Sequence, residues 1–248
     1  MNTSEIYADL DGQVYEIKIS RANKMNALTD AMYGSLVDHM KYAESNPDIK
    51  VILIRSDNEH FTAGNDLADF VENEFTNESN VFAFLITIAS LTKPLVCAVG
   101  GAAVGIGTTM LLHCDLVYAN ADTKFSVPFI KLGLTPEGGS SSLLAKKCGA
   151  AKAHEWLLTG RTFLTEEAEQ AGLINGSFDD LESTWAGARK AAKSLSYSSL
   201  EALIATKKLL KGDDIESVIS LMKKEGDVFQ ERLESDEAKA ALNAFLNG

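Results

Sequence analysis

Cysteine and histidine are scarce in this sequence, and neither is arranged as a metal or redox site. The three cysteines, Cys97, Cys114 and Cys148, are odd in number, and no pair has the short spacing of a zinc knuckle or a redox motif. We interpret them as reduced core thiols in a reducing compartment. The four histidines are widely spaced and form no HxH or HExxH motif: His39, His60, His113 and His154. We therefore expect no metal site.

Positive charge is also in short supply. Asp and Glu together number 35 against 23 Lys and Arg, which gives a net charge of −12. A nucleic-acid-binding protein would normally carry a basic face, and the sequence shows none, so we expect no nucleic-acid partner. An anionic ligand would need local positive charge or backbone N–H groups, because the overall field repels it.

Long uninterrupted hydrophobic segments are absent as well. The longest apolar run, residues 94–112, is broken by glycines and is shorter than a membrane span requires. The first residues, MNTSEIYADLDG, are polar and acidic, unlike a signal or transit peptide, and the final FLNG carries no peroxisomal or ER address. These features predict a cytoplasmic bacterial protein without a membrane partner.

The hydrophobic pattern that is present predicts an α/β core followed by a helical region. Apolar runs predict strands at 14–20, 51–55, 94–99 and 116–119, and helical periodicity predicts a helix at 29–44 with Thr29 as its N-cap. Later in the chain the pattern is wholly helical, with helices expected at 198–211, 215–233 and 236–246. We therefore predict a core over residues 1–190 and a helical region over residues 191–248.

Two small-residue turns follow predicted strands and are candidates to present backbone N–H groups to a ligand. They are GGAAVGIG at 100–107 and HFTAGNDL at 60–67, where the N–H of Ala63 is placed to point at a carbonyl group. Each also has a plainer interpretation. The first is close packing of a strand on a helix, and the second is an ordinary turn with Asp66 as a helix N-cap. GGAAVGIG lacks the GxGxxG spacing of a dinucleotide site.

A carboxylate stands on a glycine hinge in the third candidate, GLTPEGGSSS at 133–142. Glu137 fits the acidic first turn of a helix, which the helix dipole favours. It also fits a base, because the apolar residues just upstream would remove water from the carboxylate and raise its pKa toward the range useful for proton transfer. Two backbone-donor turns and one carboxylate together suit chemistry on an acyl carbonyl.

Six ordered blocks of the sequence resemble the crotonase (enoyl-CoA hydratase/isomerase) superfamily over almost the whole chain. They are RANKMNALT (21–29), FTAGNDL (61–67), KPLVCAVGGAAVGIGTTMLLHCDLVYA (93–119), FSVPFIKLGLTPEGGSSSLL (125–144), LTGRTFLTEEAEQAGLIN (158–175) and EGDVFQERLESDEAKAALNAF (225–245). The resemblance implies a crotonase-like ββα spiral, with two near-perpendicular sheets flanked by helices. It also implies a C-terminal helical region that mediates homotrimers or dimers of trimers.

The same resemblance implies an acyl-CoA thioester substrate and no separate cofactor. The thioester oxygen would lie between the backbone N–H groups of Ala63 and Ile106. The residues implied to contact the adenine and pantetheine parts of CoA are Lys24, Asn26, Ala27, Leu28, Asn65, Asp66 and Leu67.

Departures from the family pattern indicate which reaction to expect. The family's hydratases have glutamates at the positions of Thr109 and Phe129, and neither side chain can activate water or deliver a proton. The stretch PFxxLGLTPEGGSS instead resembles Δ3,Δ2-enoyl-CoA isomerases related to peroxisomal and chromodomain-Y-like proteins, in which the glutamate of PEG is the base. We therefore expect Glu137 to move a proton from C2 to C4 during fatty-acid β-oxidation. The pocket would be dry and lined by Thr109, Phe129 and Leu132.

Two alternatives stay open beside the isomerase. One is a hydratase or another crotonase reaction that uses a different acid, and the other is an acyl-CoA-binding module without catalysis, against which the retained glutamate argues. The acids available to the first alternative are Asp66, Glu72 and Glu74. Candidates to bind the CoA phosphates are Arg21, Lys24 and the pair Lys207 and Lys208, and candidates to be contributed by a neighbouring subunit are Lys239 and Phe245.

Overall fold

A six-stranded sheet forms the centre of the fold in the computed structural model, which describes residues 5–72, 79–211 and 215–247. The first two strands pair antiparallel, and every later neighbour in this sheet is parallel. In spatial order the strands are β1 (Ile6–Asp11), β2 (Val14–Ile19), β3 (Val51–Ser56), β4 (Leu95–Val99), β6 (Leu116–Asn120) and β9 (Gly176–Phe178). A second sheet contains β5 (Ala102–Val104), β7 (Lys124–Ser126) and β8 (Phe163–Leu164).

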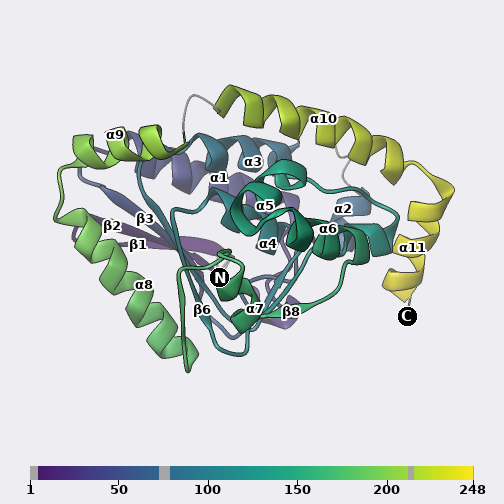
Figure 1. The fold of residues 1–248 in the computed structure, drawn as a ribbon, viewed down its shortest axis with the longest axis horizontal. Coiled ribbons are helices and arrows are strands. Elements are labelled where there is room, and N and C mark those ends of the chain that lie inside the picture. The colour runs from purple at the N-terminus through teal and green to yellow at the C-terminus, as the bar shows by residue number, and fades with distance from the viewer. Residues whose placement is uncertain (1–4, 73–78, 212–214, 248) are drawn as a thin grey trace.

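Helices cover both faces of the larger sheet, as Figure 1 shows. Along β3, Val51 and Leu53 face α8 (Leu181–Ser196), whereas Ile52 and Ile54 face the main core. Strands buried on both faces read as continuous apolar runs, which explains the sequence VILI. The main core also takes in α1 (Asp30–Ser45) and α3 (Asn80–Ser90).

The remaining helices complete the layers and the C-terminal part. In Figure 1 the helix α10 crosses the same side of the molecule as α3, and α11 follows at one end. The remaining helical segments are η1 (Ala22–Lys24), α2 (Leu67–Glu72), α4 (Ile106–Thr109), η2 (Met110–His113), η3 (Pro128–Leu132), α5 (Ser140–Cys148), α6 (Ala150–Thr159), α7 (Thr165–Gln170), α9 (Leu200–Lys211), α10 (Ile215–Leu233) and α11 (Asp236–Asn247).

The structure confirms the predicted α/β class with mixed sheets, flanking helices and a helical C-terminal part. Each predicted strand is found within about one residue of its expected bounds, and Thr29 caps α1 by accepting a hydrogen bond from the N–H of Met32 (3.3 Å). The turn at 100–107 is different from the prediction, because it contains the short strand β5. The expected division between residues 190 and 191 falls inside α8 and stays a prediction.

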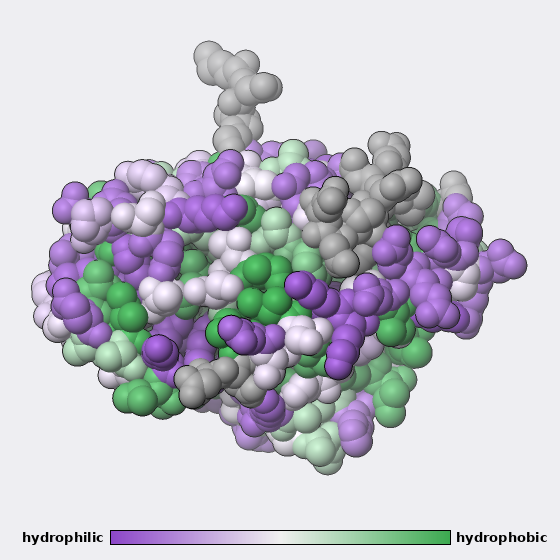
Figure 2. Space-filling view, turned by 90° about the horizontal axis from the view of Figure 1, so that it is seen from above, coloured by the Kyte–Doolittle hydropathy of each residue, from purple (hydrophilic) through white to green (hydrophobic). Residues whose placement is uncertain are grey.

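The surface on the side of α9 and α10 contains both hydrophilic and hydrophobic residues. Hydrophilic residues cover much of this face, with apolar patches between them (Figure 2). Leu209 and Leu210 of α9 are each 83% exposed. Within the described ranges, no helix has both the length and the apolar character needed to cross a membrane.

A buried ion cluster attaches α8 to the large sheet. Glu16 of β2 accepts hydrogen bonds from Arg55 of β3 (2.5 Å) and from Arg189 of α8 (2.8 Å). The guanidinium of Arg55 lies 4.4 Å from the ring centroid of Trp185, so it also makes a cation–π contact with α8. One carboxylate is therefore the shared counter-ion of two guanidinium groups between the sheet and the helix.

Replacing Glu16 with Gln should lower the free energy of unfolding by about 3 kcal/mol, because two guanidinium groups would lose their shared countercharge. Urea unfolding measures the effect, with Glu231→Gln on the exposed face of α10 as the control. A loss below about 1 kcal/mol, the range of exposed ion pairs, would contradict this account.

Candidate active site

A cavity of about 810 Å³ lies between the turns at the carboxyl ends of the strands and the C-terminal helices. Its volume suits a ligand of cofactor or drug size. One side consists of residues 23–25, 27, 63–68 and 104–106, and the other of η3, Phe229 of α10 and α11. Phe129 of η3 packs edge-on against Phe229, with ring centroids 6.5 Å apart. The predicted pocket residues Phe129 and Leu132 therefore lie on its wall.

The residues expected to contact CoA divide into cavity-lining and buried positions. Asn26 is fully buried: its side chain donates to the carbonyl of His60 (2.6 Å) and accepts from the N–H of Arg21 (2.6 Å). Leu28 is 1% exposed, so both Asn26 and Leu28 support the loop from the protein interior and do not line the cavity. The expected residues that line the cavity are Lys24, Ala27, Asn65, Asp66 and Leu67.

The two turns that were expected to supply backbone donors are joined in a fixed register. The N–H of Thr62 donates to Ala102 (2.9 Å), and the N–H of Val104 donates back to Thr62 (3.0 Å). Gly64 has φ +95°, and a Cβ placed on it would lie 2.9 Å from the carbonyl oxygen of Val104. Only glycine allows the two turns to approach this closely.

The available donor in the first turn differs from the prediction. The N–H of Ala63 donates to the carbonyl of Met25 (2.9 Å), so it is already engaged. The N–H of Asn65 and that of Ile106, the first residue of α4, have no acceptor among the described residues, and both residues line the cavity. The β-bridge between Leu28 and Asn65 explains the difference. Leu28 pairs with the carbonyl of Gly64 and the N–H of Asp66, so the N–H of Asn65 between them points away from Leu28.

Glu137 is a buried carboxyl group with one satisfied oxygen. It precedes Gly138 (φ +69°) and Gly139 (φ +76°), whose left-handed conformations turn the chain into α5. Its Oε1 accepts a hydrogen bond from the hydroxyl of Thr109 (2.5 Å), and its Oε2 has no hydrogen-bond partner among the described residues. Burial, opposed by Thr109 and assisted by the charge of Glu225, raises the pKa of Glu137 to about 8.

Glu137 is not among the residues that line the cavity. Burial and then the charge of Glu137 raise the pKa of Tyr33, so the carboxyl group acts electrostatically on this phenol. The hydroxyl of Tyr33 donates to the side-chain oxygen of Asn65 (2.5 Å), and Asn65 lines the cavity. Tyr33 therefore holds the turn with the unpaired N–H and also lies within the electrostatic influence of Glu137.

Thr109, one of the two hydratase positions, and Asp66, one of the alternative acids, both make structural contacts. Thr109, expected on the pocket wall, is not part of the cavity lining and instead donates to Glu137. Asp66 is tied to Arg21 (2.6 Å) and accepts from the N–H groups of Ala68 and Asp69. Burial raises the pKa of Asp66, but these hydrogen bonds outweigh it and lower the pKa overall. The side chain of Glu72 and the whole of Glu74 lie outside the described residues.

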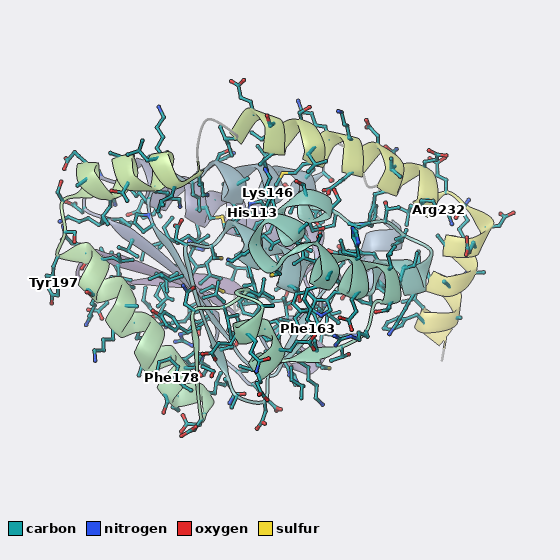
Figure 3. The ribbon with its side chains drawn as sticks, in the orientation of Figure 1. His113, Lys146, Phe163, Phe178, Tyr197 and Arg232 are labelled. Carbon is teal, nitrogen blue, oxygen red and sulfur yellow. The ribbon has the colours of Figure 1, made fainter. Side chains whose placement is uncertain are left out.

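Sequence reasoning missed three residues around Glu137. They are Tyr33, His113, which lies inside the molecule on the side of α10 (Figure 3), and Glu225 of α10. Arg232, also on α10, donates to the carbonyl of Gly133 (3.0 Å) and so attaches this helix to the loop before Glu137 (Figure 3). The helix predicted at 215–233 and the block 225–245 both include Glu225, but neither assigned it a role.

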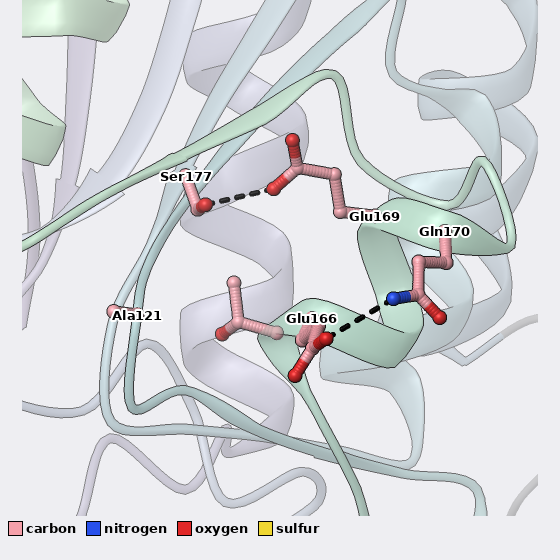
Figure 4. A pocket seen from close by; sticks show the side chains of 6 residues that line it. Ala121, Glu166, Glu169, Gln170 and Ser177 are labelled. Atoms are coloured by element: carbon pink, nitrogen blue, oxygen red, sulfur yellow. Dashed lines mark hydrogen bonds between the residues drawn. The ribbon is translucent and has the colours of Figure 1, made fainter.

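A second hollow, of about 560 Å³, does not suit an anionic thioester. It is lined by Ala121, Thr165, Glu166, Glu169, Gln170 and Ser177 (Figure 4). Glu169 accepts from Ser177 (2.7 Å) and Glu166 accepts from Gln170 (3.1 Å), so both carboxylates have partners. In the described parts of the chain, no three Cys, His, Asp or Glu side chains gather as a metal site would require.

Gly64→Ala should cost about 2 kcal/mol more than Gly149→Ala, because the added methyl group collides with the backbone of the neighbouring turn. Gly149 is a matched control: its φ is +82°, and a Cβ there meets nothing within 4 Å. Urea unfolding of both variants measures the difference. Equal losses would show that the contact with Val104 does not constrain Gly64.

Glu137→Gln should become more stable relative to wild type as the pH rises. The folded wild type holds a proton on Glu137 up to about pH 8, whereas an unfolded carboxyl releases it near 4.5, so wild type loses stability between these values. The amide stays neutral, and the difference should grow by about 3 kcal/mol from about pH 5 to about pH 8. Urea unfolding across this range tests it. A difference that does not change with pH would contradict the raised pKa.

Comparisons with known proteins identify the family of this chain. The family model for enoyl-CoA hydratase/isomerase matches residues 9–247. The chain is 28% identical to the 2,3-dehydroadipyl-CoA hydratase of Escherichia coli, over 98% of this chain and 96% of that protein. It is 32% identical to the enoyl-CoA delta isomerase 2 of Rattus norvegicus, over 95% of this chain but only 62% of that longer protein.

A solved structure extends the similarity to three dimensions. The structure of Pseudomonas aeruginosa OdaA has a TM-score of 0.96 and 38% sequence identity, and the alignment covers 99% of this chain and 100% of that one. Hydratases and isomerases occur among the relatives at similar identity, so identity alone does not distinguish the two reactions. The match of the family model over nearly all of the chain establishes that this protein is a member of the enoyl-CoA hydratase/isomerase family of the crotonase superfamily.

Proposed function

We propose that this protein is an isomerase that moves the double bond of an enoyl-CoA from Δ3 to trans-Δ2, with Glu137 as its single acid and base. One observation carries the proposal. Glu137 is a buried carboxyl group with one oxygen held by Thr109 and the other unpartnered, while Thr109 and Phe129 occupy the positions of the hydratase acids. A reaction that takes up and returns one proton needs one such group.

The proposed reaction conserves the proton. The Glu137 carboxylate removes a proton from C2, and the C–H electron pair forms a dienolate with its charge on the thioester oxygen. The protonated Glu137 then delivers a proton to C4, the double bond settles between C2 and C3, and the carboxylate is regenerated. Wall residues such as Phe129 and Phe229 keep water from the intermediate.

We propose that the thioester oxygen is held by the backbone N–H groups of Asn65 and Ile106. Ile106 was expected in this role, and Asn65 replaces Ala63 because the Ala63 N–H is engaged by Met25. A single donor of this kind is worth about 3 kcal/mol in the transition state. The hydrogen bond from Tyr33 to the Asn65 side chain supports the position of this turn.

Basic residues at the cavity suit the CoA phosphates. Lys24 and Lys131 line it, and among the described residues neither has an ion-pair partner, whereas Arg21 is paired with Asp66. Lys207 is buried and donates to Asp115 (2.7 Å), which removes it as a candidate, and Lys208 lies on α9, away from the lining.

Further expectations from the resemblance belong to the same proposal. The CoA moiety is part of the substrate and no other cofactor takes part. The enzyme works in the cytoplasm, in fatty-acid β-oxidation, as a homotrimer or a dimer of trimers. Phe245 of the chain's own α11 lines the cavity, so this helix contributes to the site without a neighbouring subunit.

The test compares trans-3-hexenoyl-CoA with crotonyl-CoA, using wild type, Glu137→Gln and the exposed control Glu231→Gln. We expect fast isomerisation, little hydration, and at least a roughly thousandfold loss of isomerisation in Glu137→Gln alone. Because the carboxylate is the active form, kcat/KM for isomerisation should rise about tenfold per pH unit up to about pH 8.

Other outcomes separate the alternatives. Strong hydration of crotonyl-CoA that survives in Glu137→Gln would overturn the isomerase and point to another acid, such as Asp66. Binding of acyl-CoA esters without turnover of either substrate would favour a binding module.

A further inference from the structure

The Gly138–Gly139 peptide unit, one residue after Glu137, forms hydrogen bonds through both its carbonyl and its N–H. The carbonyl of Gly138 accepts a hydrogen bond from Nε2 of His113 (2.8 Å). The N–H of Gly139, in the same peptide unit, donates to Oε2 of Glu225 (2.6 Å). Burial lowers the pKa of His113 to about 4, so the ring is neutral and Nε2 carries the hydrogen that the carbonyl requires.

Glu225 does more than hold this peptide, because both of its oxygens are used. Its Oε1 accepts from the N–H of Ser141 (2.9 Å), in the first turn of α5. Gly139, the residue before α5, has no side chain to cap the helix, so Glu225 supplies that cap from α10. The side chain is buried in this position.

We propose that Glu225 is a positioning residue for Glu137. Its carboxylate fixes the Gly138–Gly139 peptide, which directs the Glu137 side chain, and its negative charge acts on the neighbouring carboxyl group. The inference rests on the proposed function in one respect: Glu137 is taken to be the group that moves the proton.

The electrostatic part of this inference depends on all the groups around Glu137. Tyr33 faces it from α1, His113 contacts the adjacent Gly138 from η2, and Glu225 faces it from α10. Tyr33 and His113 are neutral near pH 7, because burial raises the pKa of the phenol and lowers that of the imidazole. Lys147, Lys207 and Lys211 face His113. Burial raises the pKa of Glu225 itself, against the hydrogen bonds from Ser141 and Gly139, and the ionised form of Glu225 opposes ionisation of Glu137.

The position of Glu225 on α10 also connects the base to the substrate cavity. Phe229 lies one helical turn after Glu225, lines the cavity and packs on Phe129. One face of α10 therefore contacts both the peptide that follows Glu137 and the cavity. A ligand that displaces Phe229 would act on the same helix that positions Glu137.

The decisive variant is Glu225→Gln, which keeps the size of the side chain and removes its charge. We expect the Glu137 carboxyl to titrate roughly one pH unit lower, and the acid limb of kcat/KM for 3-hexenoyl-CoA to move with it. A loss of kcat of roughly tenfold should accompany the shift, because the amide can accept from only one of the two N–H groups. Carboxyl ¹³C NMR follows Glu137 directly, its resonance being the one absent from Glu137→Gln.

Two control variants separate charge from structure. Glu231→Gln removes a charge from the exposed face of the same helix and should leave the titration and the rate unchanged. Glu225→Asp keeps the charge but shortens the reach, so it should lower kcat while leaving the acid limb in place. A purely structural role for Glu225 would change kcat or stability without moving the titration of Glu137.

The inference is overturned if the Glu137 carboxyl titrates at the same pH in folded Glu225→Gln as in wild type. If Glu225→Gln does not fold, Glu137→Gln answers the same question by reciprocity. Glu225 should then titrate at a lower pH than in wild type, and an unchanged titration would overturn the inference. Failure of the proposed function looks different: Glu137→Gln would retain turnover, while the NMR shift in Glu225→Gln would still appear.

Discussion

Keeping one carboxyl group out of water is the constraint on which this structure depends. The Glu137 side chain is buried with one oxygen unpartnered, and its raised pKa, about 8, places it where it can both take and return a proton. Such a group destabilises the fold whenever it ionises, so other contacts must offset that cost. The packed core and the hydrogen bonds that join the turns are such contacts.

Replacement of one residue changes what the surrounding family site can do. A carboxylate at position 109 would be a second acid beside Glu137, and two close carboxylates compete for one proton. Thr109 instead donates a hydrogen bond that orients Glu137 and leaves its other oxygen unpartnered. In the proposed reaction, the proton chemistry available to this family fold therefore depends on which carboxylates the chain retains.

Short sequence motifs predicted those residues of the candidate site that lie within one continuous stretch of the chain. Glu137, Ile106 and Phe129 were identified because each belongs to a short recognisable stretch. Ala63 was chosen as a donor because the sequence does not show that its N–H pairs with Met25 across the fold. Tyr33, His113 and Glu225 come near Glu137 only through the packing of distant segments, and no sequence motif gives them a role.

Strands as short as β5 and β8 contain too few residues for their periodicity to be recognised in the sequence.

The order of the chain gives the C-terminal helices a further consequence. A ribosome makes Ile106 and Glu137 well before Glu225 and Phe229, and the N-terminal parts of a protein generally fold first. Until α10 docks, α5 lacks its cap and the carboxyl group lacks one wall of its dry surroundings. The hydrogen bonds from the start of α5 to Glu225 are therefore among the last contacts of the candidate site to form during biogenesis.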